Sequence, residues 1–363
     1  MIEIDFERLR TMGLTPALAN QAAALPHPEN ETTLLMRVTE VHRESVRLQD
    51  GEREFSARGM PRLNRMLADD DTALAVGDWV LAAHDTHGQT WVHERVPPLT
   101  HISRRDADGR RHPVVSNVDT ALLVMGLDED FNPRRLERYL ALVHASEVTP
   151  VVVLTKADVI DRVPGALQAR IAELDGRVPA DVELLAVDGT EARTAQRMAP
   201  LLTPGQTLVV LGSSGAGKST LTNTLIGESV QDTGAVRAHD SRGKHTTTTR
   251  SLFRLPGGAC IIDTPGLRAL RPDVDETTLT ASFRDIESLA MRCRFRDCKH
   301  RDEPGCAVRE GVGADRLRNY HKLLREARRD TMSVLERQQQ VSLWKQRGRE
   351  ARMRMRAKYD GSG

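Results

Sequence analysis

The segment TLVVLGSSGAGKST, residues 207–220, decides the fold class of this chain. A continuous apolar run precedes GSSGAGKS, which matches the pattern G-x-x-x-x-G-K-[ST], and a helical pattern follows it. In such a strand–loop–helix unit, the backbone N–H groups at the start of the helix bind phosphate. We therefore predict an α/β domain with a phosphate-binding loop, and a chance glycine-rich turn is the alternative.

Two side chains of the phosphate-binding loop are expected to contact the nucleotide and its metal ion. Lys218 would reach the β- and γ-phosphates, and Ser219 would ligate Mg²⁺. The full set of predicted contacts is Gly212, Ser213, Ser214, Gly215, Ala216, Gly217, Lys218, Ser219 and Thr220.

Two later stretches fit the same domain. CIIDTPGL, residues 260–267, ends an apolar strand with Asp263, placed to hold Mg²⁺ through water, and with Gly266, whose N–H could sense the γ-phosphate. RGKHTTTTR, residues 242–250, suits a switch loop in which one hydroxyl, here assigned to Thr247, completes the Mg²⁺ shell. The alternatives are an ordinary strand-to-turn segment and a disordered polar linker.

VVVLTKAD, residues 151–158, is typical of a loop that reads guanine. Lys156 would lay its aliphatic stem over the base, and Asp158 would accept hydrogen bonds from the guanine ring N–H and amino group, neither of which adenine offers. An unpaired buried carboxylate is costly, so such a site should reject ATP. The predicted contacts are Thr155, Lys156, Ala157 and Asp158, and Thr155 stands where such loops usually carry Asn, which puts one tie to the rest of the site in question.

The order of these parts is unusual, because the phosphate loop normally precedes the base-reading loop. Here the order is base-reading loop, a candidate base-backing loop LAVDG at 185–189 that includes Ala186, phosphate loop, switch loop and DTPG. A chain that has been cut and rejoined explains this order, since domain termini often lie close together at the surface. We therefore predict a circularly permuted GTPase domain over residues 112–272.

Chain length and composition indicate which further domains accompany the GTPase domain. The 363 residues suffice for two or three domains, and the net charge of +1 does not by itself indicate a nucleic-acid partner. Residues 1–32 suggest a loosely ordered leader, and residues 33–98 contain short β-rich runs that predict an OB-type barrel, either nucleic-acid binding or merely structural. With neither an apolar span nor a secretory signal in view, we expect a cytoplasmic protein without membrane contact.

Residues 281–363 predict a helical domain that binds zinc. Cys293, Cys298, His300 and Cys306 form a C-x4-C-x-H-x5-C set, which suits a closed structural Zn²⁺ site, whereas scattered reduced cysteines are the alternative. The basic tail either binds RNA or is a solvated helix end, and its cations are Lys345, Arg347, Arg349, Arg352, Arg354, Arg356 and Lys358.

With the barrel in front, the permuted motifs from Thr155 to Gly266 and the cysteine–histidine set behind, the chain resembles the RsgA (YjeQ) family of GTPases. The resemblance implies a late assembly factor that binds the small ribosomal subunit and its rRNA as a monomer. It implies GTPase activity stimulated by the subunit, and release after hydrolysis to GDP.

The family's hydrolysis residue is not the Gln of many GTPases, and Leu267 follows DTPG here. Within the matching switch, His245 is the candidate that orients the attacking water. The competing hypotheses are an ATP-using P-loop enzyme and an RNA-binding module not tied to the ribosome.

Overall fold

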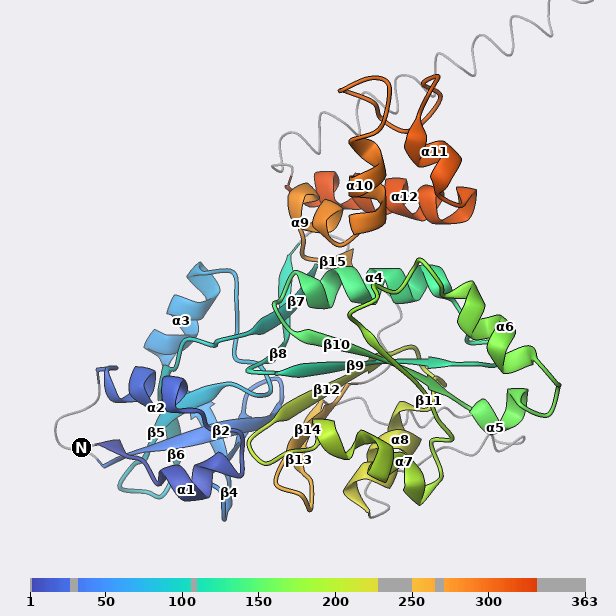
Figure 1. Cartoon of the computed structure of the whole chain (residues 1–363). Helices are drawn as coiled ribbons and strands as arrows, with labels where there is room; N and C mark the ends of the chain where they lie inside the picture. Colours follow the sequence, from blue (N-terminus) through green and yellow to red (C-terminus); the bar gives the residue numbers. More distant parts are fainter. Residues whose placement is uncertain (1, 27–31, 106–109, 228–249, 265–270, 332–363) are drawn as a thin grey trace, which may run out of the picture.

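The computed structural model describes residues 2–26, 32–105, 110–227, 250–264 and 271–331. In these ranges the chain forms an amino-terminal barrel, a central α/β domain and a carboxy-terminal helical domain that sits beside helix α4 of the α/β domain (Figure 1). Three predicted features lie outside the described residues: switch residues 242–249 with His245 and Thr247, Gly266, and the basic tail. None of the described helices is long and apolar enough to cross a membrane.

The barrel has the expected OB-type architecture. Its strands are β2 (Thr33–Val41), β3 (Val46–Gln49), β4 (Glu54–Gly59), β5 (Trp79–His84) and β6 (Thr90–Arg95), with α3 (Pro61–Asp69) between β4 and β5. Strand β2 pairs with both β3 and β5, and β4 pairs with β6, so the sheet closes on itself. Met36, Val38 and Val80 are fully buried inside it.

The α/β domain is built on a largely parallel sheet in the order β11-β10-β9-β12-β14-β13. Its strands are β9 (Thr120–Gly126), β10 (Thr149–Thr155), β11 (Glu183–Ala186), β12 (Thr207–Gly212), β13 (Ser251–Arg254) and β14 (Cys260–Asp263). The late strand β12 lies in the middle, between β9 and β14. Because parallel strands present their carboxyl ends at one edge, the loops after β9, β10, β11, β12 and β14 converge, which confirms the permuted arrangement.

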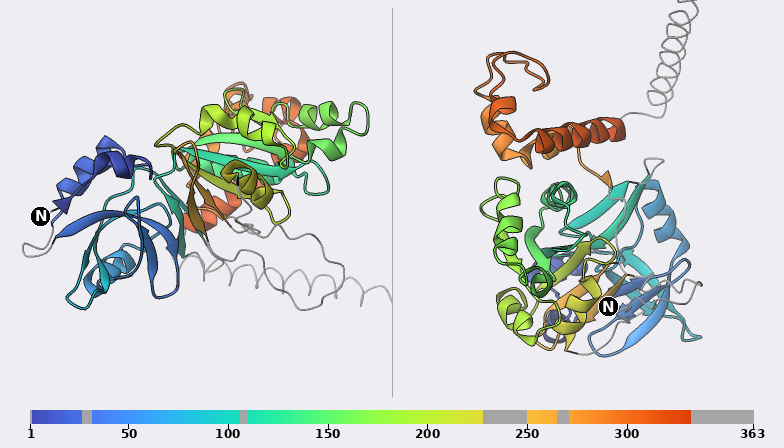
Figure 2. Two further views of the ribbon diagram at one scale, coloured as in Figure 1. Left: turned by 90° about the horizontal axis from the view of Figure 1, so that it is seen from below. Right: turned by 90° about the vertical axis from the view of Figure 1, so that its right-hand side faces the viewer.

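Helices cover both faces of this sheet, as its continuous apolar strands predict (Figures 1 and 2). Alternate residues of β9 face opposite ways, so Leu123 packs in the core that includes α4, whereas Leu122 packs in the core that includes α8. The helices of this domain are α4 (Pro133–His144), α5 (Ala157–Ile160), α6 (Ala166–Glu173), α7 (Ala192–Met198), the 3₁₀ helix η1 (Ala199–Leu201) and α8 (Lys218–Ile226).

The expectation of a loosely ordered leader over residues 1–32 is wrong for its described part. Strand β1 (Ile2–Glu3) pairs with β2, and helices α1 (Phe6–Arg10) and α2 (Pro16–Ala23) are capped by the side chains of Asp5 and Thr15. Leu9 and Leu18 are buried in the main core. These short helices are stabilised because their apolar residues pack against the domains that follow.

A buried arginine joins the amino-terminal part, the barrel and the α/β domain. Arg37 on β2 is fully buried and donates hydrogen bonds to Thr207 Oγ1 and to the carbonyl oxygen of Asn117, each at 2.9 Å. It also donates to the carbonyl oxygen of Met12 and lies over the ring of Trp79. Backbone carbonyls and a hydroxyl therefore replace the water that this cation loses on folding.

A second sheet links the barrel to the carboxy-terminal domain. Strands β7 (His101–Arg105) and β8 (Arg111–Ser116) pair with each other, and β15 (Arg271–Pro272) pairs with β7. The helical domain follows with α9 (Glu276–Ala281), α10 (Arg284–Ala290), α11 (Ala307–Gly311) and α12 (Ala314–Thr331), packed around Leu279, Phe283 and Leu323.

Candidate functional site

The phosphate loop leaves β12 at Gly212 and enters α8 at Lys218. Gly215 and Gly217 have φ angles of +84° and +88°, a left-handed conformation that glycine adopts without strain. A Cβ atom at Gly212 would lie 2.4 Å from the carbonyl oxygen of Val124, so the strand and loop can approach this closely only with glycine. The sequence therefore builds the loop curvature that presents backbone N–H groups at the start of α8.

Lys218 is 6% exposed and folds back over this loop. Its Nζ donates a 2.7 Å hydrogen bond to the carbonyl oxygen of Ser213. Burial lowers the pKa of Lys218, and the attraction of Asp263 opposes that shift. A cation held in this way would gain a better partner when a phosphate group arrives.

Asp263 ends β14 beside the phosphate loop and is 2% exposed. The backbone of Asp263 pairs with Val210 of β12, and the hydroxyl of the next residue, Thr264, donates to the carbonyl oxygen of Val210 at 2.6 Å. Together with the hydroxyl of Ser219, this carboxylate supplies the hard oxygen donors that Mg²⁺ prefers. The donor set thus fits a magnesium ion bound with nucleotide.

The base-reading loop is tied to the phosphate loop by two side chains. The hydroxyl of Thr155 donates to the carbonyl oxygen of Ala216 at 2.6 Å, and Lys156 Nζ donates to the carbonyl oxygen of Gly215 at 2.7 Å. Thr155, which stands in place of the usual Asn, therefore still forms a hydrogen bond to the phosphate loop. Asp158 is exposed in the first turn of α5, where its carboxylate is open to a ligand.

The segment LAVDG, the candidate base-backing loop, is bonded to two neighbouring parts of the α/β domain. Val187 donates from its backbone N–H to the carbonyl oxygen of Leu154 at 2.8 Å, and Ala157 donates back to the carbonyl oxygen of Val187 at 3.3 Å. Thr224 on α8 donates from its hydroxyl to the carbonyl oxygen of Gly189 at 2.6 Å. These bonds fix the segment between the base-reading loop and α8.

Sequence reasoning missed two aspartates in the loop after β9. Asp128 Oδ2 lies 2.6 Å from Lys156 Nζ, and Asp130 Oδ1 accepts a 2.5 Å hydrogen bond from Ser213 Oγ. Partial burial opposes ionisation of Asp128, but hydrogen bonds led by that of Lys156 bring the pKa of this carboxyl below its ordinary value. The short segment DED at 128–130 matches no motif, and only its position after a central parallel strand could have indicated it.

The four predicted metal ligands come together in the helical domain. The ligand atoms of Cys293, Cys298, His300 and Cys306 all lie within 4.8 Å of one another. The Sγ atoms of Cys293 and Cys306 are 3.9 Å apart, and they lie 3.6 Å and 3.5 Å from His300 Nδ1. Tetrahedral zinc with ordinary bond lengths requires S···S and S···N separations of about 3.8 and about 3.6 Å, so the donor set fits Zn²⁺.

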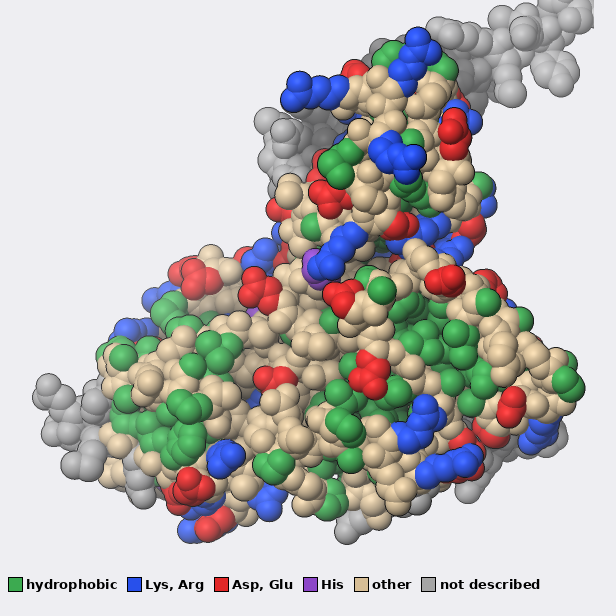
Figure 3. Space-filling model, in the orientation of Figure 1, with side chains coloured by type: hydrophobic (Ala, Val, Ile, Leu, Met, Phe, Trp, Pro, Cys, Tyr) green, Lys and Arg blue, Asp and Glu red, His purple; other side chains and the backbone are tan. Residues whose placement is uncertain are grey.

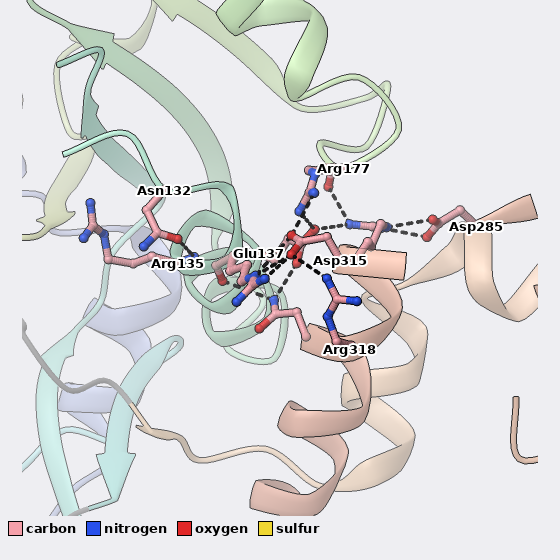
Figure 4. A network of polar contacts seen from close by, with 10 residues as sticks. Asn132, Arg135, Glu137, Arg177, Asp285, Asp315 and Arg318 are labelled. Carbon is pink, nitrogen blue, oxygen red and sulfur yellow. Dashed lines mark hydrogen bonds and ion pairs between the residues drawn. The ribbon is translucent and has the colours of Figure 1, made fainter. Parts of the chain in front are cut away.

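A network of ionic contacts attaches the helical domain to α4 (Figure 4). Glu137 on α4 is 3% exposed and accepts from Arg316 at 2.7 Å and from Arg177 at 3.0 Å. Arg316 on α12 also forms a two-pronged pair with Asp285, with distances of 2.7 and 2.8 Å. Arg177 in turn reaches Asp315, so α4, α10, α12 and the segment after α6 meet at one cluster.

The described residues that follow the predicted switch loop and the DTPG segment are anchored on neighbouring parts of the chain. Ser251, which starts β13, pairs with Glu40 of the barrel strand β2 and donates from its hydroxyl to Glu40 at 2.9 Å. Asp273, just after β15, accepts from Arg105 at 2.6 Å and forms an ion pair with Arg111. Strand β13 is thus fastened to the barrel, and the residue after β15 is fastened to strands β7 and β8.

The class of the protein follows from four features: a phosphate loop in the middle of the sheet, a TKAD loop that precedes it in sequence, a fused OB-type barrel, and a helical domain whose cysteine–histidine cluster could hold a metal ion. Together they define a circularly permuted P-loop GTPase. The comparisons agree with this class: the family described as RsgA GTPase matches residues 94–272. The chain belongs to the RsgA GTPase family.

Curated relatives are similar over most of their length. The chain is 45% identical over 311 residues to the small ribosomal subunit biogenesis GTPase RsgA of Xanthomonas campestris pv. campestris (strain B100), covering 84% of this chain and 82% of the relative. It is 43% identical over 335 residues to the protein of the same name from Xanthomonas axonopodis pv. citri (strain 306), covering 89% of each.

Two solved structures share the fold. YjeQ from Thermotoga maritima superposes with a TM-score of 0.58 at 22% sequence identity. The match covers 81% of this chain and 98% of the YjeQ chain. YloQ, described as a circularly permuted GTPase, superposes with a TM-score of 0.57 at 21% sequence identity. The match covers 85% of this chain and 100% of the YloQ chain. At these identities the likeness supports the architecture alone.

Proposed function

We propose that this chain hydrolyses GTP to GDP and phosphate as a late factor in biogenesis of the small ribosomal subunit. The observation that supports the nucleotide assignment is the contact of Thr155 and Lys156 with residues 215–216, because it brings the segment proposed to read guanine next to the segment proposed to bind phosphate. The relatives' name, small ribosomal subunit biogenesis GTPase, supports the process.

The proposed roles follow from the chemistry of each side chain. Asp158 accepts from the guanine ring N–H and amino group, and Lys218 with the backbone N–H groups of residues 212–220 holds the phosphates. Ser219 would hold Mg²⁺ directly and Asp263 would hold it through water. The hydroxyl of Thr247 would complete the Mg²⁺ shell, and the N–H of Gly266 would contact the γ-phosphate. Bound Mg²⁺ would neutralise developing charge on the β- and γ-phosphate oxygens.

We assign orientation of the attacking water to His245, because Leu267 occupies the position after DTPG and has no group that can bind water. If the assignment holds, His245→Ala retains nucleotide binding and loses turnover stimulated by the subunit. Full stimulated turnover in this variant would show that another group orients the water.

We propose three domains, a barrel at 33–98, the GTPase domain at 112–272 and a zinc-binding helical domain at 281–363. The four ligands Cys293, Cys298, His300 and Cys306 would hold one structural Zn²⁺. Lysine and arginine side chains are spread over the carboxy-terminal domain, with acidic side chains between them (Figure 3). With the basic tail, they would contact rRNA on the subunit, and the protein would act in the cytoplasm as a monomer.

The test is hydrolysis of GTP and of ATP by the purified chain, with and without purified small ribosomal subunits. We expect slow GTP turnover that the subunits stimulate strongly, no comparable effect on ATP, and no turnover by Lys218→Ala. Steady ATP turnover without stimulation would instead indicate a P-loop NTPase not tied to the ribosome. RNA binding that does not depend on nucleotide would favour an RNA-binding module.

A further inference from the structure

The loop after β9 touches the nucleotide site through a side chain to which no role has been given. Asp128 Oδ2 lies 2.6 Å from Lys156 Nζ, and the same Nζ lies 2.7 Å from the carbonyl oxygen of Gly215. One ammonium group thus connects three segments: the loop after β9, the base-reading loop and the phosphate loop. The contact is partly open to solvent, with side-chain exposures of 32% for Lys156 and 35% for Asp128.

The backbone of Lys156 adopts a conformation that is typical of ligand-binding loops. Its φ of +61° places it in the left-handed region, which is unfavourable for a residue with a side chain. Such a conformation persists only where the surroundings hold it in place, and it occurs often at ligand-binding sites. The backbone bond from Ala157 N–H to the carbonyl oxygen of Val187, at 3.3 Å, holds the adjoining peptide, and the bonds from Lys156 Nζ to Asp128 and Gly215 fix the far end of the side chain.

The loop that carries Asp128 is itself held in shape. Asp128 Oδ1 accepts from the backbone N–H of Asp130 at 3.2 Å, and Asp130 Oδ2 accepts from the backbone N–H of Gly126 at 3.1 Å. A Cβ atom at Gly126 would lie 2.5 Å from Asp128 Oδ1, so the carboxylate occupies its position only because this residue is glycine. Asp128 is therefore presented to Lys156 by a defined turn.

We propose that Asp128 is a positioning residue for guanine nucleotides, which fixes the Lys156 side chain so that its aliphatic stem lies along the base while its ammonium group fastens the phosphate loop. The proposal rests on the proposed function, because it requires that residues 155–158 read guanine. Asp128 acts through Lys156 and does not itself touch the nucleotide. Loss of its charge should therefore weaken nucleotide affinity and leave the rate of the bound complex nearly unchanged.

The test compares dissociation constants for GDP and ADP in the full-length chain. Asp128→Asn should weaken GDP binding about fivefold, the scale of a partly exposed ion pair. Asp128→Glu keeps the charge and should recover part of the loss, whereas Glu129→Gln, an exposed change in the same loop, should bind GDP as the wild type does.

A double-mutant cycle separates positioning from a general structural defect. Lys156→Met keeps an aliphatic stem and removes the ammonium group, so Asp128→Asn should cause no further loss in that background. Additive losses, or wild-type GDP affinity in Asp128→Asn, would overturn the proposal while leaving the GTPase assignment intact. Wild-type protein that binds ADP as tightly as GDP would overturn both.

Discussion

The hydroxyl of Thr155 lies 2.6 Å from the carbonyl oxygen of Ala216, to which it donates a hydrogen bond across 61 residues of chain. Both residues are buried, with exposures of 1% and 0%. The contact joins the predicted base-reading loop to the phosphate loop, so it holds these two loops at a fixed distance from each other. A shorter side chain than the usual Asn suffices because Gly217, beside it, leaves room for the phosphate loop to approach.

Thr155→Val should remove this bond and keep the volume of the side chain. The carbonyl oxygen of Ala216 would then be buried without its donor, which costs about 1–3 kcal/mol. We expect a lower free energy of unfolding in urea by about that amount, together with weaker GDP binding. Thr155→Ser retains the hydroxyl and serves as the control; equal stability of the Val and Ser variants would contradict the prediction.

Asp158→Ala should abolish the preference for GTP over ATP. Each hydrogen bond from guanine to this carboxylate is worth about 1.5–3 kcal/mol, because its acceptor is charged. Asp158→Asn replaces the carboxylate with an amide, which can donate a hydrogen bond. The variant should therefore prefer a base that carries a carbonyl where guanine carries its amino group, as in xanthosine nucleotides. Competition binding measures both effects, and Asp161→Asn, an exposed change in the same region, should leave GTP preference unaltered.

Cys306→Ser should lower the zinc content of the purified protein, whereas Cys260→Ala should not. Cys306 is 2% exposed and contributes to the core of the helical domain, so losing the metal should unfold this domain locally. Metal analysis and proteolysis of the carboxy-terminal region measure these effects. The GTPase domain should retain GDP binding, and full zinc content in Cys306→Ser would show that this thiol is not a ligand.

The phosphate loop, the permuted order, the barrel and the clustering of three cysteines with a histidine could be predicted from the sequence because each depends on a recognisable local pattern. GSSGAGKS follows an apolar strand, and the four candidate metal ligands lie within one short segment. Asp128 and Arg37 have no such signature. Their roles depend on segments that are distant in sequence, Lys156 for the first and Met12, Asn117 and Thr207 for the second.

The amino-terminal helices could not be predicted from the sequence for a related reason. Helices of five and eight residues are too short to be stable alone, so their pattern is weak in the sequence. Leu9 and Leu18 are buried only because the barrel and the α/β domain provide a surface for them. Local periodicity could not reveal a core to which three parts of the chain contribute.

Glu137→Ala should weaken the attachment of the helical domain to α4. Removing this carboxylate leaves the guanidinium groups of Arg177 and Arg316 with fewer partners in a largely buried cluster, and breaking a buried ion pair in this way costs about 3–5 kcal/mol. Urea unfolding should show the loss, with earlier proteolysis between the GTPase and helical domains. The exposed change Glu310→Gln, within the helical domain, should leave both measurements at their wild-type values.

His101 should make the protein less stable as the pH falls below neutrality. Its Nδ1 lies 2.9 Å from Ser116 Oγ, and burial, followed by the positive charge of Arg95, lowers the pKa of His101 from its ordinary value of 6.5. Arg111 acts in the same direction, while Asp78 and Asp273 oppose it.

Below about pH 6.5 the unfolded chain takes up a proton at His101 that the folded chain does not, so the unfolded state is favoured until the folded pKa is also passed. The free energy of unfolding, measured in urea from about pH 7.5 to about pH 5, should therefore fall less steeply in His101→Asn than in the wild type. His87→Asn, at an exposed site, should follow the wild-type slope. A His101→Asn slope equal to that of the wild type would mean that His101 titrates alike in both states, and that the contacts around Ser116 leave its proton affinity unchanged.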